Sequence, residues 1–356
     1  MTGTISKALS GALRYIPGLL LILAICIPAM AVQQQIVVNG KEVVSAVAVA
    51  ILLGILIRNV LGIPEACRAG TSLAVKRVLR VGIALMGAQL SLMQVLQSGA
   101  RSLIVIAICI TAAILLVRGI GVRMGLSERL GVLIGVGTSI CGVSAIVATA
   151  PVIEAREEET SLAVGTITIF GLLALFIYPF LGRLLHLSNT FFGTWAGTAV
   201  NDTSQVVATG LIYSQKAGEV ATVVKLTRNL FMAPVIVILS SAHVMRRDGA
   251  ERGAEGGREK RAGNRWKTLR TAFPVFVLGF LGMAVLNSLG AFTPVLRQGI
   301  GEASRWLILV AIAGVGLETN IASMRRVGLR PFYAGLCAAV LMAGVSYGLI
   351  TLLGIG

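Results

Sequence analysis

Apolar runs of about 20 residues recur along the whole 356-residue chain, and this repetition restricts the fold more than any other feature. A helix of that length crosses the hydrocarbon core of a bilayer, whereas a β-barrel would alternate apolar and polar residues. The chain is 56% hydrophobic and only 13% charged, about half the charge of an average soluble domain. We therefore predict an all-α polytopic membrane protein with about 11 transmembrane helices.

The predicted spans fall into two groups on either side of one polar segment. They cover residues 16–32, 43–63, 78–98, 101–118, 130–151, 161–182, 191–213, 221–244, 271–290, 304–323 and 331–353. The polar segment, residues 246–268, is dominated by Gly, Glu, Arg and Lys, a composition typical of a linker. We expect one integral membrane domain, with spans one to eight in residues 1–245 and spans nine to eleven in residues 269–356.

Basic residues gather at the ends of the apolar runs and orient the chain. With the N-terminus in the cytoplasm, about three quarters of the 31 Lys and Arg residues lie inside, together with the linker. This distribution predicts a C-terminus outside, and it accounts for the net charge of +16 without a nucleic-acid partner. Lys7 and Arg14, followed by an apolar run and Ala29-Met30-Ala31, also resemble a cleaved signal peptide.

The five cysteines and two histidines offer little for metal or disulfide chemistry. The cysteines have no paired spacing, and both histidines lie near predicted helix ends, so we expect neither a metal site nor a cofactor. The Gly-x-x-x-x-Gly-Lys-Ser/Thr loop of ATP-binding proteins is missing from the sequence, which argues against ATP-driven transport. An intramembrane enzyme with Cys141 or Ser144 as nucleophile would have no neighbouring histidine base, and we do not expect an enzyme.

The first candidate site lies in residues 137–153, where a long apolar span begins with glycines and hydroxyl residues. Glycine weakens a helix, and non-helical backbone inside a membrane survives only where it is covered by protein or lines a cavity. We expect a broken helix whose second half presents N–H groups from about Gly142 to Ala145 to an anion. Additional hydroxyl donors would come from Thr138, Ser139 and Ser144. Small residues that only permit tight helix packing are the alternative interpretation.

The second candidate site is a polar run in the middle of the seventh span. It comprises Asn201, Asp202, Thr203, Ser204 and Gln205. A charge at bilayer depth is costly unless it is paired or hydrated, so Asp202 is predicted to carry a coupling ion and its neighbours to bind substrate. A hydrogen-bonded structural Asp is the alternative.

The two candidate segments also align with each other without a gap. The matching residues are Gly137-Thr138 with Gly197-Thr198, Ser144 with Ser204, and Val147-Ala148-Thr149 with Val207-Ala208-Thr209. A shared use of small residues would also produce this likeness.

A third candidate follows two glycines in the tenth span, at Glu318 and Asn320. It lies five spans after the first candidate, and an odd offset inverts orientation, as an inverted-repeat transporter requires. Glu318 is predicted to hold a coupling ion with Asn320, or else to form an interfacial ion pair with Arg325 and Arg326.

Two basic residues, Lys225 and Arg228, lie one helical turn apart on one face of the eighth span. They could bind a divalent anion or neutralise Asp202. The alternative is that both side chains extend to the membrane interface.

Four stretches together resemble a known family. They are residues 137–145 (GTSICGVSA), Asn201-Asp202 with residues 205–208 (QVVA), residues 225–228 (KLTR) with Ala233-Pro234, and residues 316–320 (GLETN). They are similar to the bacterial inner-membrane family named sulfate exporters, which is grouped with bile-acid symporters and cation–proton antiporters. The resemblance implies two inverted five-helix repeats, core and panel domains, and discontinuous crossing helices in spans five and ten. Members often have His where this chain has Asn201, which puts a proton relay through that position in question.

These features predict a secondary active transporter of the inner membrane, an exporter of a small inorganic or organic anion such as sulfate. Half-helix N–H groups would bind the anion, and Lys225 or Arg228 would supply positive potential. Asp202 and Glu318 would carry a coupling H⁺ or Na⁺, and the core would move against the panel. A homodimer is compatible with this prediction. The main alternative is a cation–proton antiporter with Asp202 and Glu318 as its ion site.

Overall fold

The described part of the chain is almost entirely helical, as the sequence predicts. The computed structural model describes residues 13–35, 37–38, 41–42, 45–232, 234–239, 241, 276–324 and 328–355. The predicted linker at 246–268 lies outside these residues. Among them, six helices are long and apolar enough to cross a membrane, and two shorter helices are also apolar. These helices support a multi-pass membrane protein, whereas eleven full spans are not confirmed.

The chain folds into two compact units, each assembled from separate parts of the sequence. Unit 1 contains Met1–Leu96, Val207–Glu219 and Phe276–Arg325, and unit 2 contains Gln97–Val206, Val220–Val275 and Arg326–Gly356. Three helices pass through a boundary between these stretches. They are α6 (Leu92–Ala112), α12 (Thr203–Tyr213) and α13 (Gln215–Leu230).

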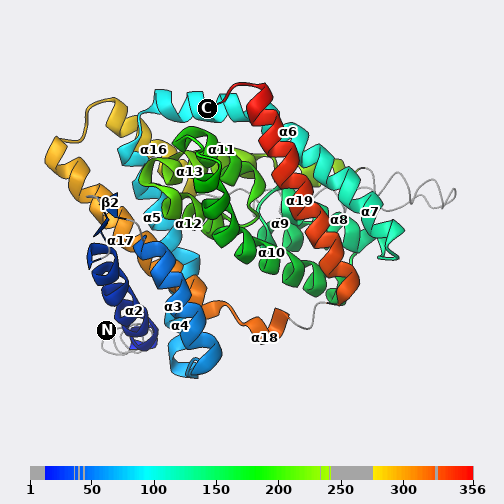
Figure 1. Ribbon diagram of the computed structural model, residues 1–356, viewed down its shortest axis with the longest axis horizontal. Helices are drawn as coiled ribbons and strands as arrows, with labels where there is room; N and C mark the ends of the chain where they lie inside the picture. Colours follow the sequence, from blue (N-terminus) through cyan, green and yellow to red (C-terminus); the bar gives the residue numbers. More distant parts are fainter. Residues whose placement is uncertain are drawn as a thin grey trace, which may run out of the picture. The chain divides into compact units, whose positions relative to one another are not determined.

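Unit 1 is built on helices that pack closely through glycines. Its other elements are α2 (Ile16–Gln35), β1 (Val37–Val38), β2 (Lys41–Glu42), α3 (Ala46–Val60), α4 (Glu65–Leu73), η1 (Ala74–Val78), α5 (Leu79–Met86), η2 (Gly87–Gln89), α16 (Phe276–Ser288), α17 (Pro294–Glu318) and α18 (Ile321–Met324). The helices α2, α3 and α17 run side by side (Figure 1). Where α17 meets α3, a Cβ added to Gly316 would lie 3.1 Å from the Cα of Gly54. Only residues without a side chain permit this approach of two backbones.

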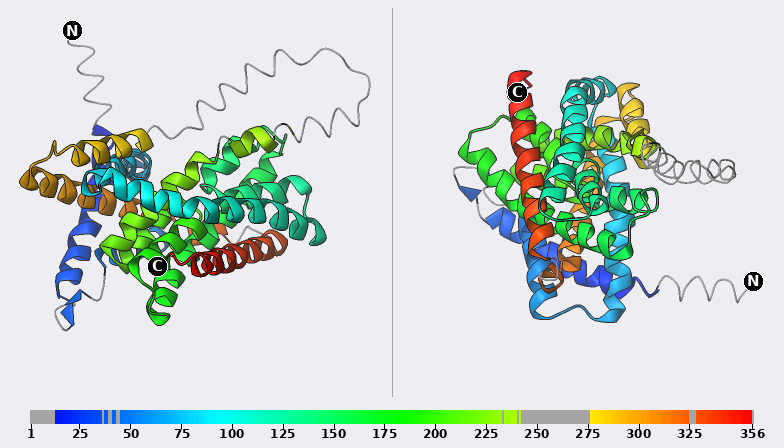
Figure 2. Two further views of the ribbon diagram at one scale, coloured as in Figure 1. Left: turned by 90° about the horizontal axis from the view of Figure 1, so that it is seen from above. Right: turned by 90° about the vertical axis from the view of Figure 1, so that its right-hand side faces the viewer.

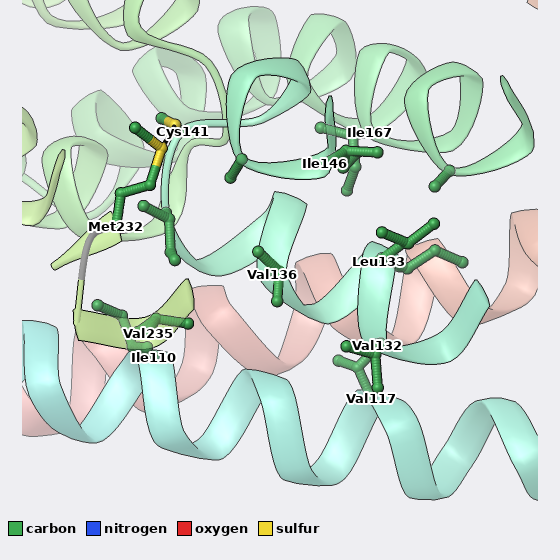
Figure 3. Close-up of a cluster of buried hydrophobic side chains, with 14 of the residues drawn as sticks. Ile110, Val117, Val132, Leu133, Val136, Cys141, Ile146, Ile167, Met232 and Val235 are labelled. Carbon is green, nitrogen blue, oxygen red and sulfur yellow. Dashed lines mark hydrogen bonds between the residues drawn. The ribbon is translucent and has the colours of Figure 1, made fainter. Parts of the chain in front are cut away.

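The helices of unit 2 pack around a core of aliphatic side chains. Its other elements are η3 (Ala113–Val117), α7 (Arg118–Arg123), α8 (Glu128–Ser139), α9 (Val143–Thr149), α10 (Glu157–Leu184), α11 (Asn189–Ala199) and α19 (Leu329–Leu352). The core includes Leu133 and Val136 of α8, Ile146 of α9 and Ile167 of α10 (Figure 3). α6, η3 and α7 form one continuous helix, and α19 is a single long helix, red in Figure 2.

The third and fourth predicted spans have the wrong boundaries. The elements α4, η1, α5 and η2 make residues 65–89 helical, and the next helix begins at Leu92, so the predicted span 78–98 straddles two helices. Lys76 and Arg77 are exposed on the first of these helices. Lys and Arg are good helix formers, but their charge gives the segment the hydropathy of a loop. The fourth span, predicted at 101–118, extends over Leu92–Arg123.

The tenth predicted span is interrupted only near its end. α17 continues to Glu318, and its glycines contribute to helix packing in unit 1. A Cβ on Gly314 would lie 3.2 Å from a methyl group of Val75, and Gly316 packs on α3 as described above. Close helix packing and a helix break both require small residues, so glycines in the sequence do not show which of the two occurs. Two inverted five-helix repeats are not confirmed.

The fifth predicted span is broken, as expected, but its second half turns back. Ile146 of α9 lies against Gly137 of α8, where an added Cβ would be 2.7 Å from the Cδ1 of Ile146. The starts of α8 and α10 are also joined, because Oγ of Ser127 donates to Oε1 of Glu159 (2.5 Å). The chain therefore returns toward the start of α8 before α10 begins. The membrane orientation derived from eleven full spans stays a prediction.

Candidate functional site

Unit 2 contains two helix breaks that fall at equivalent positions in two similar stretches of sequence. Residues 140–142 separate α8 from α9, and residues 200–202 separate α11 from α12. The second break lies in the seventh predicted span, where the sequence had not predicted one. The gap-free alignment of the two segments places the breaks at matching positions. The sequence likeness therefore reflects a repeated local structure and not only a shared use of small residues.

Lys225 and Arg228 of α13 connect the two breaks, and both side chains are 0% exposed. Nζ of Lys225 donates to the carbonyl oxygens of Ile140 (2.7 Å), Val200 (3.4 Å) and Asn201. Nε and the two terminal nitrogens of Arg228 donate to the carbonyl oxygens of Ile140 (2.8 Å), Thr138 (2.8 Å), Gly197 (3.2 Å) and Thr198. Each cation therefore binds carbonyl groups at both breaks.

These hydrogen bonds satisfy backbone groups that the breaks leave without helical partners. The last carbonyl groups of a helix have no intrahelical donor, and the C-terminal end carries a partial negative charge. Two such ends, those of α8 and α11, are buried in unit 2. A buried cation is costly unless it is paired, and the carbonyl oxygens offset that cost. The prediction that Lys225 and Arg228 extend to the membrane interface is wrong, because both are fully buried.

The residues that precede the second half-helices lie in contact with each other. Gly142 precedes α9 with φ 65° and ψ −126°, a conformation that glycine adopts far more readily than other residues. A Cβ on Gly142 would lie 3.5 Å from the Cα, the Cβ and Oδ2 of Asp202, which precedes α12. The Asp202 carboxylate is thus held beside the N-terminal end of α9.

Asp202 also caps α12 through its other carboxylate oxygen. Oδ1 accepts hydrogen bonds from the backbone N–H (2.9 Å) and the hydroxyl (2.6 Å) of Ser204. The backbone N–H of Asp202 donates to Oε1 of Gln205 (3.3 Å), and the Gln205 side chain packs on Gly171 of α10. This reciprocal pattern resembles a capping box, except that the carboxylate binds the N–H of the second helical residue and not the third. The structural role predicted as the alternative for Asp202 is present, and its role in coupling stays a prediction.

Four other predicted substrate residues border the same breaks. Thr138 and Ser139 are buried, and their hydroxyls donate to carbonyl groups of α8 at 2.8 and 3.4 Å. Ser144 is exposed in the first turn of α9. Asn201 is buried, and its Nδ2 donates to a carbonyl oxygen of α10 at 3.3 Å. The structure brings these residues together with Asp202 in unit 2, and their substrate roles stay predictions.

Comparison with known proteins places the chain in a family. Residues 17–335 match a family model described as conserved hypothetical protein 698. A Streptococcus pyogenes protein of serotype M18, named UPF0324 membrane protein, is 35% identical over 355 residues, which cover 98% of this chain and 100% of the relative. The chain belongs to the UPF0324 membrane protein family.

Other UPF0324 relatives cover nearly the same length. One from Pseudomonas aeruginosa is 34% identical over 358 residues, with 98% of this chain and 95% of the relative covered. One from Nitratidesulfovibrio vulgaris is 32% identical over 343 residues, with 93% and 92% covered. Their names describe membrane proteins and give no substrate. A multi-pass membrane protein of this family is thus supported by both the names and the helices, whereas sulfate export stays a prediction.

Glu318 and Asn320 of this UPF0324 protein belong to unit 1, whereas both breaks belong to unit 2. Glu318 is exposed at the end of α17 and interacts electrostatically with Lys76 and Arg58. Oδ1 of Asn320 accepts from the backbone N–H of Ala322 (2.9 Å) at the start of α18. The predicted partners of Glu318 at positions 325 and 326 lie outside the described residues.

Two asparagines that the sequence patterns did not single out lie at helix breaks. Asn229 of α13 is 5% exposed, and its Nδ2 lies 3.5 Å from Oγ1 of Thr203 in the first turn of α12. In unit 1, the side chain of Asn59 bridges α17 and α18, because it donates to the carbonyl oxygen of Thr319 (3.0 Å) and accepts from the N–H of Ile321 (2.8 Å). An amide within an apolar span was the available signal in both cases.

Proposed function

We propose that this protein is a secondary transporter that moves a small oxyanion across the inner membrane, with Asp202 carrying a coupling proton. The observation that supports this function is a pair of buried basic side chains that share one carboxylate at the two breaks. Lys225 and Arg228 are both buried there. Among the described groups that interact electrostatically with either side chain, Asp202 is the one carboxylate. With both basic groups protonated, one positive charge is left over, and this charge would favour a bound anion.

Asp202 would couple proton and anion through this charge. When Asp202 is protonated, both positive charges are uncompensated and an anion binds more strongly. Two unit charges about 6 Å apart interact by about 3 kcal/mol at an effective dielectric constant of about 20, which corresponds to roughly 100-fold in affinity. The coupling is reciprocal, so a bound anion also favours protonation of Asp202. Anion and proton would cross together, and their combined gradients would set the direction, including export.

The repeated helix breaks support transport over covalent chemistry. Interrupted helices at the substrate site are a recurring device of secondary transporters, because they bring backbone N–H and carbonyl groups into the middle of the protein. At the first break, Sγ of Cys141 is buried and lies 3.5 Å from Sδ of Met232 (Figure 3). We therefore assign no catalytic role to Cys141, and sulfate is the first substrate to test.

The test is labelled-sulfate flux in proteoliposomes, with wild type beside Asp202→Asn. Wild type should accumulate sulfate when an imposed pH gradient drives protons in the same direction. Asn keeps the Oδ1 acceptor that caps α12 but cannot exchange a proton. Asp202→Asn should therefore lose flux driven by the pH gradient while it retains exchange of labelled for unlabelled sulfate. Gradient-driven flux that survives in Asp202→Asn would refute the coupling role.

A cation–proton antiporter is the second candidate, and the half-buried carboxylate of Asp202 favours it. In that case Asp202 would be the ion ligand, and Asp202→Asn would abolish every mode of transport. The same proteoliposomes distinguish the two functions when sodium–proton exchange is followed by an internal pH dye. Sodium-driven proton flux without sulfate exchange would replace the oxyanion proposal.

A further inference from the structure

The two buried cations use nearly all of their hydrogen-bond donors on the backbone at the breaks. The ammonium group of Lys225 has three N–H donors, and three backbone carbonyl oxygens accept from it. Arg228 uses four of its five N–H donors on backbone carbonyl groups. A bound anion would feel their potential, but most of its direct hydrogen bonds have to come from other groups.

Asn229 is a buried side chain with unused hydrogen-bonding capacity at this place. It directly follows Arg228 and lies four residues after Lys225, so the three side chains share one face of α13. Asn229 is 5% exposed, and its Oδ1 has no partner among the described residues. Its Nδ2 makes one long contact, 3.5 Å to Oγ1 of Thr203. The amide therefore lies beside the residue that follows Asp202, in the first turn of α12.

A buried amide oxygen without a donor destabilises a protein, so such a group calls for an explanation, and a bound ligand is one. A half-turn of the amide exchanges Oδ1 with Nδ2. The hydroxyl of Thr203 can donate as well as accept, so it pairs with either end. In the turned orientation Thr203 donates to Oδ1, and both N–H groups of Asn229 are available to an acceptor. An oxyanion is the acceptor that the positive surroundings favour.

We propose that the amide of Asn229, oriented by the hydroxyl of Thr203, forms the direct contact subsite for the transported oxyanion, while Lys225 and Arg228 act on it mainly through their charge. This inference rests on the proposed function and deepens it. It assigns recognition to a neutral side chain. It also predicts selectivity for acceptor-rich ligands such as sulfate, sulfite or phosphate over halides, because a halide presents no fixed arrangement of oxygen atoms to an amide.

The experiment compares Asn229→Leu and Asn229→Asp with a matched control, Thr149→Val. Leu and Asp both keep the branched heavy-atom skeleton of the Asn side chain. Leu removes the polar group, and Asp replaces the N–H donors by a negative charge. Thr149 of α9 is another buried side chain whose hydroxyl lacks a partner, but it lies at the far end of its half-helix from the break. The readouts are the half-saturation concentration for labelled sulfate, sulfite and phosphate, and the rise in melting temperature that each anion produces in detergent.

Asn229→Leu should raise the half-saturation concentration about 10-fold or more, as expected for a lost hydrogen bond to a charged ligand. Asn229→Asp should raise it further, and Thr149→Val should leave it unchanged. Equal anion affinity in wild type and both Asn229 variants would overturn the subsite but not the proposed function. A wild-type protein that neither binds nor moves these anions would overturn the proposed function and, with it, this inference.

Discussion

Two helix breaks, one between α8 and α9 and one between α11 and α12, fall at equivalent positions of the aligned segments and bind the same two cations. They differ at the residue before the second half-helix. Thr138 and Thr198 are equivalent in the alignment, and the carbonyl oxygens of both accept from Arg228. Four residues later, just before the second half-helix, the first break has Gly142 with a positive φ. The second break has Asp202 at the equivalent position, and Asp202 caps α12. The first break therefore depends on backbone conformation, and the second on a carboxylate.

This difference separates the residue that shapes the backbone at the first break from the residue that places a carboxylate at the second. A glycine allows the chain to turn sharply at the first break, and α9 folds back on α8. The second break keeps an ionisable group against that turn, 3.5 Å from the position of a Cβ on Gly142. Substitutions at equivalent positions should consequently have unequal effects, and the cations that serve both breaks should have the largest effect.

Arg228→Met should be the most destabilising of these changes. It leaves four carbonyl hydrogen bonds unmade across both breaks. Loss of one partner from a buried charged network costs about 3–5 kcal/mol. Arg228→Lys should recover only part of this loss, because an ammonium group cannot reach both helix ends as a planar guanidinium does. The measurement is the melting temperature and the yield of monodisperse protein in detergent.

Arg101→Met is the control for Arg228→Met, because Arg101 is exposed on α6. We expect a change of less than about 0.5 kcal/mol from this surface substitution. Equal melting temperatures for Arg228→Met and Arg101→Met would show that the buried cations do not stabilise the two breaks. The comparison of the breaks through shared cations would then be wrong.

Gly142→Ala should be the next largest effect, and larger than that of Asp202→Asn. The nearest atoms to an added Cβ are 3.5 Å away, so space is not limiting, and the cost arises from the positive φ. Such a backbone conformation costs about 1–3 kcal/mol for a residue with a side chain. Asn at position 202 keeps a cap, so its cost should stay below about 1 kcal/mol. Thermal unfolding of the two variants side by side checks this order, and the reverse order would contradict it.

The sequence predicted the two segments of the site better than their geometry. Glycines and hydroxyls indicated the break near Gly142, and a charge at bilayer depth indicated Asp202. The second break was missed because residues 200–202 contain no glycine. That break is stabilised by Lys225 and Arg228, which lie more than 20 residues later in the chain, and local sequence does not show such partners. The glycines of α17 precede the interruption at residues 319–320 but themselves pack against neighbouring helices, because close packing and a helix break both require small residues.

Gly197→Ala should be more destabilising than Gly137→Ala, although the two glycines are equivalent in the alignment. An added Cβ on Gly197 meets Cβ of Val224 at 2.7 Å and the backbone oxygen of Ala221 at 2.9 Å, and neither atom can move without α13. On Gly137 it meets Cδ1 and Cγ1 of Ile146 at 2.7 and 2.9 Å and Cγ1 of Ile167 at 3.0 Å, all of them side-chain atoms that can shift without moving a helix backbone. Overpacking costs about 1–3 kcal/mol where the neighbours cannot adjust. The expected order is read from melting temperatures.

Gly119→Ala provides the reference for these two glycine variants. Gly119 is a helical glycine of α7 with no atom within 4 Å of an added Cβ. Alanine there should stabilise the protein by up to about 1 kcal/mol through helix propensity alone. Equal effects at Gly137 and Gly197, after this reference is subtracted, would mean that the first half-helices α8 and α11 are packed alike.

Thr149→Val and Thr209→Val should have the smallest effects, and they test how far the equivalence of the two half-helices extends. The two threonines match in the alignment, both are 0% exposed, and neither hydroxyl has a partner among the described residues. Valine has the same shape without the unpaired hydroxyl, so each variant should be neutral or more stable by less than about 1 kcal/mol. Melting temperatures and sulfate half-saturation should change alike in both. A loss of sulfate affinity at Thr209 alone would show that the ligand uses only the half-helix that Asp202 caps, so the equivalence would then be one of backbone and not of function.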